Sequence, residues 1–412
     1  MKRLLPAALS LVVVLAVAGF AWTTTHTPHK HRHKHPARSH AVWPGPTATP
    51  SGSLPGDVAR AQTSYEELQQ YFGTSDGSNL YRVRYPVEAT DTRYSYEWPY
   101  SQVHVALLDL AGLPGQTGSS YHAELSTADT GQMHYWADVP PGGQPGFEAT
   151  PGLPYGSGGE LYYDDNGWAG LEAAQSYIET QSPQDLQVAE RVFALEISGW
   201  DTDPTQPHAG GIYWNQPRTD GMRNTVSTMP SAELGLRLYE ATKQARYLAW
   251  ADRMYQWTKT NLQAANGLYY DHVNGDGTID ESIWSYNQGS AIRVNQLLYD
   301  VTHNDKYLTE AQRIATAAYN YFVVGKQLSS QPVAYNAILF RDLLVLEATT
   351  GGTKYRDAAQ SYADWLWTSN RDPQTGMYQD PAVPRAYVLD QAAVVQIYAT
   401  LAWPQDNLAE LT

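Results

Sequence analysis

The sequence predicts an all-α fold made of paired helices, and three observations lead to that prediction. The chain repeats a unit in which a helix ends in Thr, a short turn follows, and a second helix begins. The repeated threonines are Thr180, Thr242, Thr302 and Thr350, with spacings of 62, 60 and 48 residues. Apolar side chains recur at helical spacing within the units, and helix start and stop signals fall at the unit boundaries.

The second helix of each unit carries Leu six residues and Ala nine residues after the threonine. These residues are Leu186, Leu248 and Leu308, with Arg356 as the exception, and Ala189, Ala251, Ala311 and Ala359. Stripes such as Tyr247, Trp250, Ala251, Met254 and Tyr255 share one helix face, so we interpret them as core.

Capping signals fix several boundaries. Ser182 precedes Pro183, with Asp185 following at the third helical position, which is typical of a helix start. Gly351-Gly352 is typical of a helix end. The expected helices are 57–73, 97–111, 119–136, 166–180, 184–198, 224–242, 245–261, 285–302, 305–322, 332–350, 353–369 and 386–402.

Six helix pairs cannot bury their apolar faces singly, so they must stack or close on one another. Closure gives an (α/α)6 barrel whose loops meet at one end around a cleft, whereas stacking gives an open solenoid. Periodicity does not separate the two. Two long segments, 135–163 and 199–224, are rich in Gly, Pro or aromatic residues, and long loops in a compact domain are usually functional.

The first 56 residues predict export. Lys2 and Arg3 precede an apolar run over 4–21, which is typical of a signal peptide cut after Ala21 or of a membrane anchor at 1–21. Residues 22–56 are His-rich and basic, then rich in Pro, Ser and Thr, and are expected to form a disordered linker. The helical domain is expected over 57–412. We expect an extracytoplasmic protein, secreted or anchored, with residues 1–40 contacting the membrane or cell envelope.

Charge and composition limit the classes of molecule that the protein is expected to bind. Six of the 27 Lys and Arg residues, and none of the 42 Asp and Glu residues, precede Asp57, so the remaining chain carries a net charge of −21. That charge repels nucleic acid but does not disfavour a neutral polysaccharide. The 30 Tyr and 13 Trp far outnumber the 6 Phe, and these rings both stack and hydrogen-bond. The chain has no cysteine, hence no disulfide or thiolate metal site.

Asp164 and Asp165 form the most informative pair in the chain. No Lys or Arg lies between Arg93 and Arg191 to neutralise them locally, and Tyr162, Tyr163 and Trp168 flank them. The alternative is that one Asp caps the following helix, which leaves the second unexplained. Neighbouring Cα atoms lie 3.8 Å apart, so the carboxyls can reach the roughly 5–5.5 Å separation of retaining glycosidases. Mutual repulsion should leave one protonated and the other ionised.

Other motifs in the sequence give weaker indications of a catalytic or binding site. The segment 271–280 resembles a calcium loop but lacks the required Asp and Glu, so we interpret it as a Gly-rich turn. The six histidines beyond the N-terminal tract are scattered without ligand spacing, and no serine-hydrolase or phosphate-loop motif is present. The sequence therefore predicts no metal site and no cofactor. The segment 284–289 opens a helix with aromatics and amides that could cap it or bind sugar hydroxyls.

As a set, four segments resemble glycoside hydrolase family 76, the α-1,6-mannanase-like enzymes. They occur in the family's order and lie within a likeness that covers most of the chain from Asp57 to Trp403. The segments are Tyr162-Tyr163-Asp164-Asp165-Asn166-Gly167-Trp168, Gly210-Gly211-Ile212-Tyr213-Trp214, Arg223-Asn224-Thr225-Val226-Ser227-Thr228 and Trp284-Ser285-Tyr286-Asn287-Gln288-Gly289.

The resemblance implies an (α/α)6 barrel and a retaining endo-acting mannanase, with Asp164 as nucleophile and Asp165 as general acid/base. The residues expected to bind substrate are Trp98, Tyr162, Tyr163, Asn166, Trp168, Trp214, Arg223, Asn224, Tyr286, Asn287 and Gln288. We expect a monomer acting on an α-mannan polysaccharide or oligosaccharide. The alternatives are another sugar-active (α/α)6 enzyme, or a non-catalytic carbohydrate-binding or envelope protein on the same barrel.

Overall fold

The computed structural model describes residues 43–46, 55–140, 143–218, 220–380 and 385–411. The expected signal peptide or anchor and the His-rich tract lie outside these residues. In the described part of the chain, no helix combines the length and apolar content needed to cross a bilayer.

Helices dominate the described residues, and their bounds follow the predicted repeat. They are α1 (Asp57–Phe72), α2 (Glu97–Ala111), α3 (Gln116–Ser119), α4 (His122–Gln132), α5 (Tyr163–Thr180), α6 (Pro183–Ser198), α7 (Thr225–Thr242), α8 (Ala245–Leu262), α9 (Ser285–Thr302), α10 (Asp305–Ala318), α11 (Val333–Thr350), α12 (Lys354–Ser369) and α13 (Val388–Ala402). Short 3-10 or π segments are η1 (Met133–Tyr135), η2 (Tyr319–Val324), η3 (Leu328–Ser330) and η4 (Gln405–Glu410).

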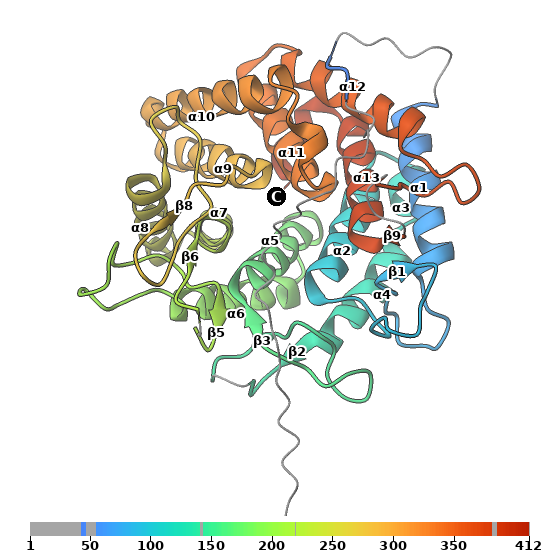
Figure 1. The fold of residues 1–412 in the computed structure, drawn as a ribbon, viewed down its shortest axis with the longest axis horizontal. Coiled ribbons are helices and arrows are strands. Elements are labelled where there is room, and N and C mark those ends of the chain that lie inside the picture. The colour runs from blue at the N-terminus through green and yellow to red at the C-terminus, as the bar shows by residue number, and fades with distance from the viewer. Residues whose placement is uncertain (1–42, 47–54, 141–142, 219, 381–384, 412) are drawn as a thin grey trace, which may run out of the picture. The chain divides into compact units, whose positions relative to one another are not determined.

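The helices form two concentric layers (Figure 1). In the described residues, six helices make the inner layer: α2, α5, α7, α9, α11 and α13 contact one another in that order, and α13 contacts α2 to close the ring. Outer helices pack against them, for example α6 on α5, α8 on α7 and α1 on α13. The ring confirms the (α/α)6 barrel and excludes the open solenoid.

The repeated threonines explain the tight turns at one end of the barrel. The Thr180 hydroxyl donates to the Ser176 carbonyl at 2.7 Å and accepts the Ser182 N–H at 3.2 Å. The residue between them, Gln181, is left-handed with φ 58°, and its N–H bonds to the Tyr177 carbonyl, as in an αL helix cap. The turns after Thr242 and Thr302 repeat these contacts. Because α5, α7 and α9 each turn back in this way, these inner helices share one direction and their N-termini lie at the opposite end.

A second repeat holds the long loops at that opposite end. Four residues after the N-cap of each inner helix, a polar side chain bonds to the backbone of another segment. Asn166 of α5 donates to the Phe147 carbonyl at 2.9 Å and accepts the Phe147 N–H at 2.8 Å. The corresponding residues are Tyr100, Thr228, Gln288, Asn336 and Gln391. These bonds satisfy buried loop backbone and fix the rim.

Short strands tie the loops together at this rim. They are β1 (Arg84–Tyr85), β2 (Trp136–Ala137), β3 (Gly146–Phe147), β4 (Leu161–Tyr162), β5 (Asn215–Gln216), β6 (Arg223–Asn224), β7 (His272–Val273), β8 (Ile279–Asp280) and β9 (Ala386–Tyr387). All pairs are antiparallel: β1 with β9, β2 with β3, β4 with β5, and β7 between β6 and β8. The β7–β8 hairpin confirms that 271–280 contains a Gly-rich turn.

Three helix predictions differ from the structure. The helix expected at 119–136 is interrupted, because the Ser119 and Ser120 hydroxyls bond to the carbonyls three residues earlier and end α3. The helix expected at 305–322 widens into the π segment η2. Helix α5 begins at Tyr163, three residues earlier than expected, which places both acids inside its first turn.

The segment 22–56 is expected to be a disordered linker, but its residue Trp43 packs into the core of the helical domain. Trp43 is fully buried and meets Tyr362 edge to face, with ring centroids 5.9 Å apart. The backbone N–H of Trp43 donates to the Ser329 hydroxyl at 2.8 Å, and the Ser361 hydroxyl donates to the Gly45 carbonyl at 3.2 Å. The packed region therefore extends to the N-terminal side of Asp57.

Candidate active site

Asp164 and Asp165 occupy the first turn of α5, at the loop end of the barrel. The N-cap is Tyr162, whose side chain makes no cap bond. Asp164 Oδ1 accepts the Asp165 N–H within this turn, so a bond to the helix backbone accounts for one acid of the pair and leaves Asp165 unexplained. Pairing of Tyr162 in β4 with Asn215 in β5 brings Trp214 alongside. Both carboxyls are partly exposed, as groups that meet substrate must be.

Asp164 is the aspartate of the pair whose carboxylate accepts hydrogen bonds from the protein. The indole Nε1 of Trp214 donates to its Oδ2 at 3.0 Å, and the Asp165 N–H donates to its Oδ1 at 3.1 Å. Burial raises the pKa of Asp164 to about 7, while these two hydrogen bonds oppose the rise and the charge of Asp271 adds to it. The Trp214 ring also packs on Tyr162, with centroids 4.9 Å apart.

Asp165 differs from its neighbour in environment. Burial raises its pKa well above the ordinary value, and the negative charge of Asp164 raises it further. In the described residues, no hydrogen bond to the Asp165 carboxyl lowers this pKa. The structure therefore distinguishes two adjacent carboxyls: Asp164 is the one stabilised as an anion, and Asp165 is the one that retains a proton.

A third carboxylate, Asp271, influences the electrostatics of the same site, and the sequence did not predict it as a site residue. Its Oδ2 lies 3.0 Å from His272 Nδ1, and Asn287 Nδ2 donates to its Oδ1 at 3.4 Å. Burial is the main cause of the raised pKa of Asp164 and of Tyr286, and the charge of Asp271 adds to both. One signal was present in the sequence: residues 161–164 and 268–271 both read Leu-Tyr-Tyr-Asp.

Aromatic side chains form a wall of the site from α2, α9 and α11. Tyr286 and Tyr335 stack face to face, with centroids 3.9 Å apart and an interplanar angle of 5°. Trp98 and Trp284 pack against Tyr335 at 6.0 and 5.8 Å. Burial is the main cause that raises the pKa of both tyrosines, and the charges of Asp271 and Asp164 add to it, so the phenol hydroxyls share the electrostatic environment of the acids. Sequence reasoning identified Trp98 and Tyr286 but missed Tyr335, which lies outside the four segments.

Several residues expected to bind substrate are buried and bonded to protein instead. Gln288 accepts the Tyr269 N–H at 2.7 Å and donates to the Tyr269 carbonyl at 3.0 Å, as Asn166 does with Phe147. Arg223, 1% exposed, pairs with Asp201 at 2.7 Å and donates to the Pro207 carbonyl at 3.0 Å. We assign these three residues to support of the rim loops rather than to contact with sugar.

The remaining expected residues divide between core and site. Tyr163 and Trp168 are 1% and 8% exposed and belong to the core cluster, and their contact with sugar stays a prediction. Asn224 lies opposite His272 in the β6–β7 pairing, and Asn287 contacts Asp271. The carbonyl oxygens of both amides are buried without a hydrogen-bond partner, and the two residues stand beside the third carboxylate.

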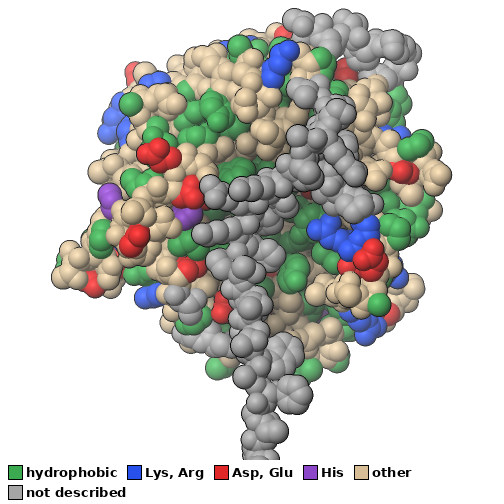
Figure 2. All heavy atoms as spheres, in the orientation of Figure 1, with side chains coloured by type: hydrophobic (Ala, Val, Ile, Leu, Met, Phe, Trp, Pro, Cys, Tyr) green, Lys and Arg blue, Asp and Glu red, His purple; other side chains and the backbone are tan. Residues whose placement is uncertain are grey.

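On the face shown in Figure 2, the visible Lys and Arg side chains of the described residues occur in small separate groups, some with Asp or Glu alongside.

Comparison with known proteins identifies the family. A family model described as glycosyl hydrolase family 76 matches residues 58–345. The chain belongs to glycosyl hydrolase family 76. This confirms the resemblance seen in the four segments, and the two aspartates, Trp214 and the Tyr286 segment all lie inside the matched region.

Relatives and solved structures agree with this family membership. The chain is 29% identical over 152 residues to mannan endo-1,6-alpha-mannosidase DCW1 of Saccharomyces cerevisiae, a match covering 35% of this chain and 33% of the relative. The chain thus matches about a third of the length of that relative. The family 76 mannosidase Bt3792 of Bacteroides thetaiotaomicron is 24% identical, with a TM-score of 0.74, covering 84% of this chain and 98% of that one.

A further solved structure shares the fold and contains a sugar. It is an inactive variant of the α-1,6-mannanase GH76A of Salegentibacter, with two consecutive aspartates replaced, in complex with α-1,6-mannotetrose. It is 21% identical to this chain, with a TM-score of 0.68, and the match covers 84% of this chain and 99% of that one.

Proposed function

We propose that this family 76 protein is an exported endo-acting α-1,6-mannanase that retains anomeric configuration, with Asp164 as nucleophile and Asp165 as general acid/base. The observation that carries the proposal is the asymmetry of the pair. Trp214 donates a hydrogen bond to Asp164, whereas the pKa of Asp165 is raised by burial and by its neighbour's charge.

The reaction follows from that asymmetry. Asp164 attacks the anomeric carbon while Asp165 gives its proton to the departing glycosidic oxygen, which forms a covalent mannosyl ester and releases the leaving chain. Asp165, now ionised, takes a proton from a water molecule that attacks the same carbon and frees Asp164. Each acid thus returns to its starting protonation state, and two successive displacements preserve the configuration.

The comparisons support the substrate class. The yeast relative is named for endo-1,6-α-mannosidase activity on mannan, and the Salegentibacter mannanase was made inactive by replacing two consecutive aspartates. Stacked tyrosines and nearby tryptophans suit sugar rings, whose apolar faces pack on aromatics while their hydroxyls need polar partners. We extend the proposal to localisation: the apolar run 4–21 directs export, and residues 1–40 hold the enzyme at the membrane or envelope. A monomeric state remains a prediction.

The proposal is tested with linear α-1,6-mannan and the variants Asp164→Asn and Asp165→Asn. We expect new reducing ends from the wild type and at least a thousandfold loss in each variant, with unchanged circular dichroism. Near-wild-type turnover by either variant would refute the assigned roles. Calorimetric binding of α-1,6-mannooligosaccharides without any new reducing ends from the wild type would instead support a non-catalytic carbohydrate-binding protein.

A further inference from the structure

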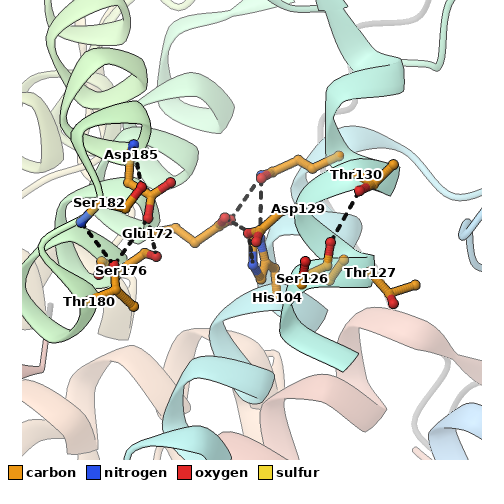
Figure 3. Close-up of polar contacts among 12 residues, drawn as sticks. His104, Ser126, Thr127, Asp129, Thr130, Glu172, Ser176, Thr180, Ser182 and Asp185 are labelled. Carbon is orange, nitrogen blue, oxygen red and sulfur yellow. Dashed lines mark hydrogen bonds and ion pairs between the residues drawn. The ribbon is translucent and has the colours of Figure 1, made fainter. Parts of the chain in front are cut away.

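A buried histidine joins three helices, and the scheme above does not use it. His104 of α2 is 3% exposed, as is Glu172 of α5, and His104 Nδ1 contacts a carboxylate oxygen of Glu172. His104 Nε2 lies 3.0 Å from Oδ1 of the half-exposed Asp129 on α4. Figure 3 shows the three side chains pointing toward one another. The contact between His104 and Glu172 therefore crosses an interface between two helices of the inner ring.

The surroundings of this imidazole require its charged form. A neutral imidazole carries one N–H, whereas the imidazolium carries two. Here Nδ1 faces Glu172 and, at 3.2 Å, the side-chain oxygen of Gln132, while Nε2 faces Asp129. Although burial lowers the pKa of His104, the two carboxylates raise it to about 10. Gln132 Nε2 also donates to Glu172 Oε2 at 2.9 Å, so both oxygens of this buried carboxyl have partners.

His104 supplies a positive charge that this part of the chain otherwise lacks. No Lys or Arg lies between Arg93 and Arg191, so α2, α4 and α5 contain neither. The other acids on these three helices are Glu97, Asp109, Glu124, Asp164, Asp165 and Glu179. Among the other helices packed on α2, α3 has no charged residue and α13 has only Asp390, in its first turn. A buried carboxylate without a cation is costly, so His104 is what allows Glu172 to lie at this interface.

The ion pair lies two helical turns from the acids of the site. Glu172 follows Asp165 by seven residues, which is two turns of about 3.6 residues each, so the two side chains share one face of α5. That face lies against α2, because Glu172 meets His104 there. Six residues before His104, the first turn of α2 carries Trp98, a ring of the aromatic wall. The register between α2 and α5 therefore sets the place of Asp165 relative to that wall.

We propose that His104 and Glu172 are positioning residues: their buried ion pair holds α5 against α2 and so fixes the first turn of α5, with Asp165, against the aromatic wall. The inference rests on the proposed function. Neither partner touches substrate in this scheme, and both act through the helix that carries the acids. Gln132 supports the pair from α4, since its amide contacts both partners. A displacement of about 1 Å at a reacting group can cost about a hundredfold in rate, so a small loss of register is measurable.

Turnover of α-1,6-mannan by charge-removing variants tests this role. Removing one side of a buried ion pair leaves a charge uncompensated, whereas replacing both sides by neutral groups does not. In His104→Gln and in Glu172→Gln, assayed at a temperature where each is folded, we expect kcat to fall at least about tenfold with little change in KM. The double variant leaves a neutral amide pair and should recover to within about threefold of the wild type. Folded single variants whose kcat stays within about twofold of the wild type would overturn the proposal.

A substrate with an activated leaving group separates positioning from a general loss of structure. An α-1,6-mannobioside of 2,4-dinitrophenol needs no protonation of its leaving group, so a displaced Asp165 should matter little when release of dinitrophenolate is followed. We expect each single variant to lose at least about fivefold more rate on mannan than on this substrate. Equal losses on the two substrates would show that the pair supports the fold as a whole, and would refute positioning of Asp165.

A matched control is Asp364→Asn. Asp364 accepts from the buried Arg60 at 2.8 Å and joins α1 to α12, two helices of the outer layer. We expect this variant to lose stability while kcat and the ratio of the two rates stay unchanged. If Asp364→Asn changed that ratio as much as Glu172→Gln does, the loss of any buried ion pair would explain the effect and the proposal would fail.

Nitrogen-15 NMR of the imidazole gives an independent readout. Since the pKa of His104 is raised from 6.5 to about 10, the ion pair is fully present below pH 6.5 and is lost as the pH rises through about 10. Tyr100 of α2 faces the same two acids, but burial chiefly raises its pKa and it stays neutral. We expect an imidazolium signal that persists at about pH 8, is absent from His104→Gln and titrates at lower pH in Glu172→Gln. A His104 ring that is neutral at about pH 7 would overturn the proposed ion pair.

The outcomes distinguish this inference from the proposed function. If the wild type makes no new reducing ends from mannan, the proposed function fails. If it does and Asp165→Asn does not, while the single variants keep wild-type turnover, only the role of the ion pair fails. Should neither single variant fold, Gln132→Ala, which removes the amide that contacts both partners, gives the outcome. A larger loss on mannan than on the dinitrophenyl substrate then supports the proposal, and an equal loss or none contradicts it.

Discussion

Replacing Trp214 by Phe tests the assignment of Asp164 as the ionised partner. The change removes the Nε1–H that lies 3.0 Å from Asp164 Oδ2 but keeps an aromatic ring against Tyr162. This hydrogen bond favours the charged form of Asp164 and therefore lowers its pKa. Losing it should raise that pKa, so the acid limb of the activity profile should move to higher pH.

The size of the shift follows from the kind of bond. A hydrogen bond to a charged group contributes about 1.5–3 kcal/mol, and one pKa unit corresponds to about 1.36 kcal/mol. Because the Trp214 ring is only partly buried, water replaces part of the lost interaction, and we take the lower end, about one pH unit. The assay is the pH profile of kcat/KM on α-1,6-mannan.

The control is Trp250→Phe. Trp250 belongs to the outer helix α8 and packs against Trp200, away from the acids. Its acid limb should match the wild type. An acid limb in Trp214→Phe within about 0.2 pH unit of the wild type, with an alkaline limb that moves instead, would refute the assignment and would indicate that Asp165 is the group ionised first.

Two further predictions concern stability. Trp43→Ala leaves a cavity beside Tyr362, and replacing a buried Trp by Ala costs about 3–5 kcal/mol of unfolding free energy. Urea unfolding of a chain that includes residues 43–46 measures this cost. A loss below about 1 kcal/mol would show that the packing of Trp43 contributes little to stability. Asn166→Ala strands the buried Phe147 N–H and carbonyl at about 1–3 kcal/mol for each unsatisfied group; if the melting temperature were unchanged, Asn166 would not hold the β3 loop.

Much of the fold could be predicted because its signals are local. The Thr–turn repeat has a direct structural cause, since the hydroxyls of Thr180, Thr242 and Thr302 each bond both their own helix and the next turn. Ring closure was predicted only through the family resemblance, because the contact between α13 and α2 joins residues almost 300 positions apart and periodicity carries no information about it. The break between α3 and α4 was also missed, since it depends on serine hydroxyls that compete with helix bonds.

The site was predicted less completely than the fold. The tandem Asp164-Asp165 and Trp214 come together as expected, because β4 and β5 pair. Among the polar residues predicted to bind substrate, Asn166, Arg223 and Gln288 bond loop backbone in the structure. Sequence alone does not distinguish an amide that binds sugar from one that binds a carbonyl. Asp271 and Tyr335 were missed because each contributes from a separate loop or helix that the closed ring brings near the acids.

The most direct measurement of the central claim is proton NMR of the first products released from linear α-1,6-mannooligosaccharides. Two displacements at one carbon, through an ester of Asp164, predict that the new reducing end appears first as the α-anomer and mutarotates to the mixture afterwards. Initial release of the β-anomer would contradict the account, because it would require a single displacement by water and leave the adjacent carboxyls without the roles assigned to them.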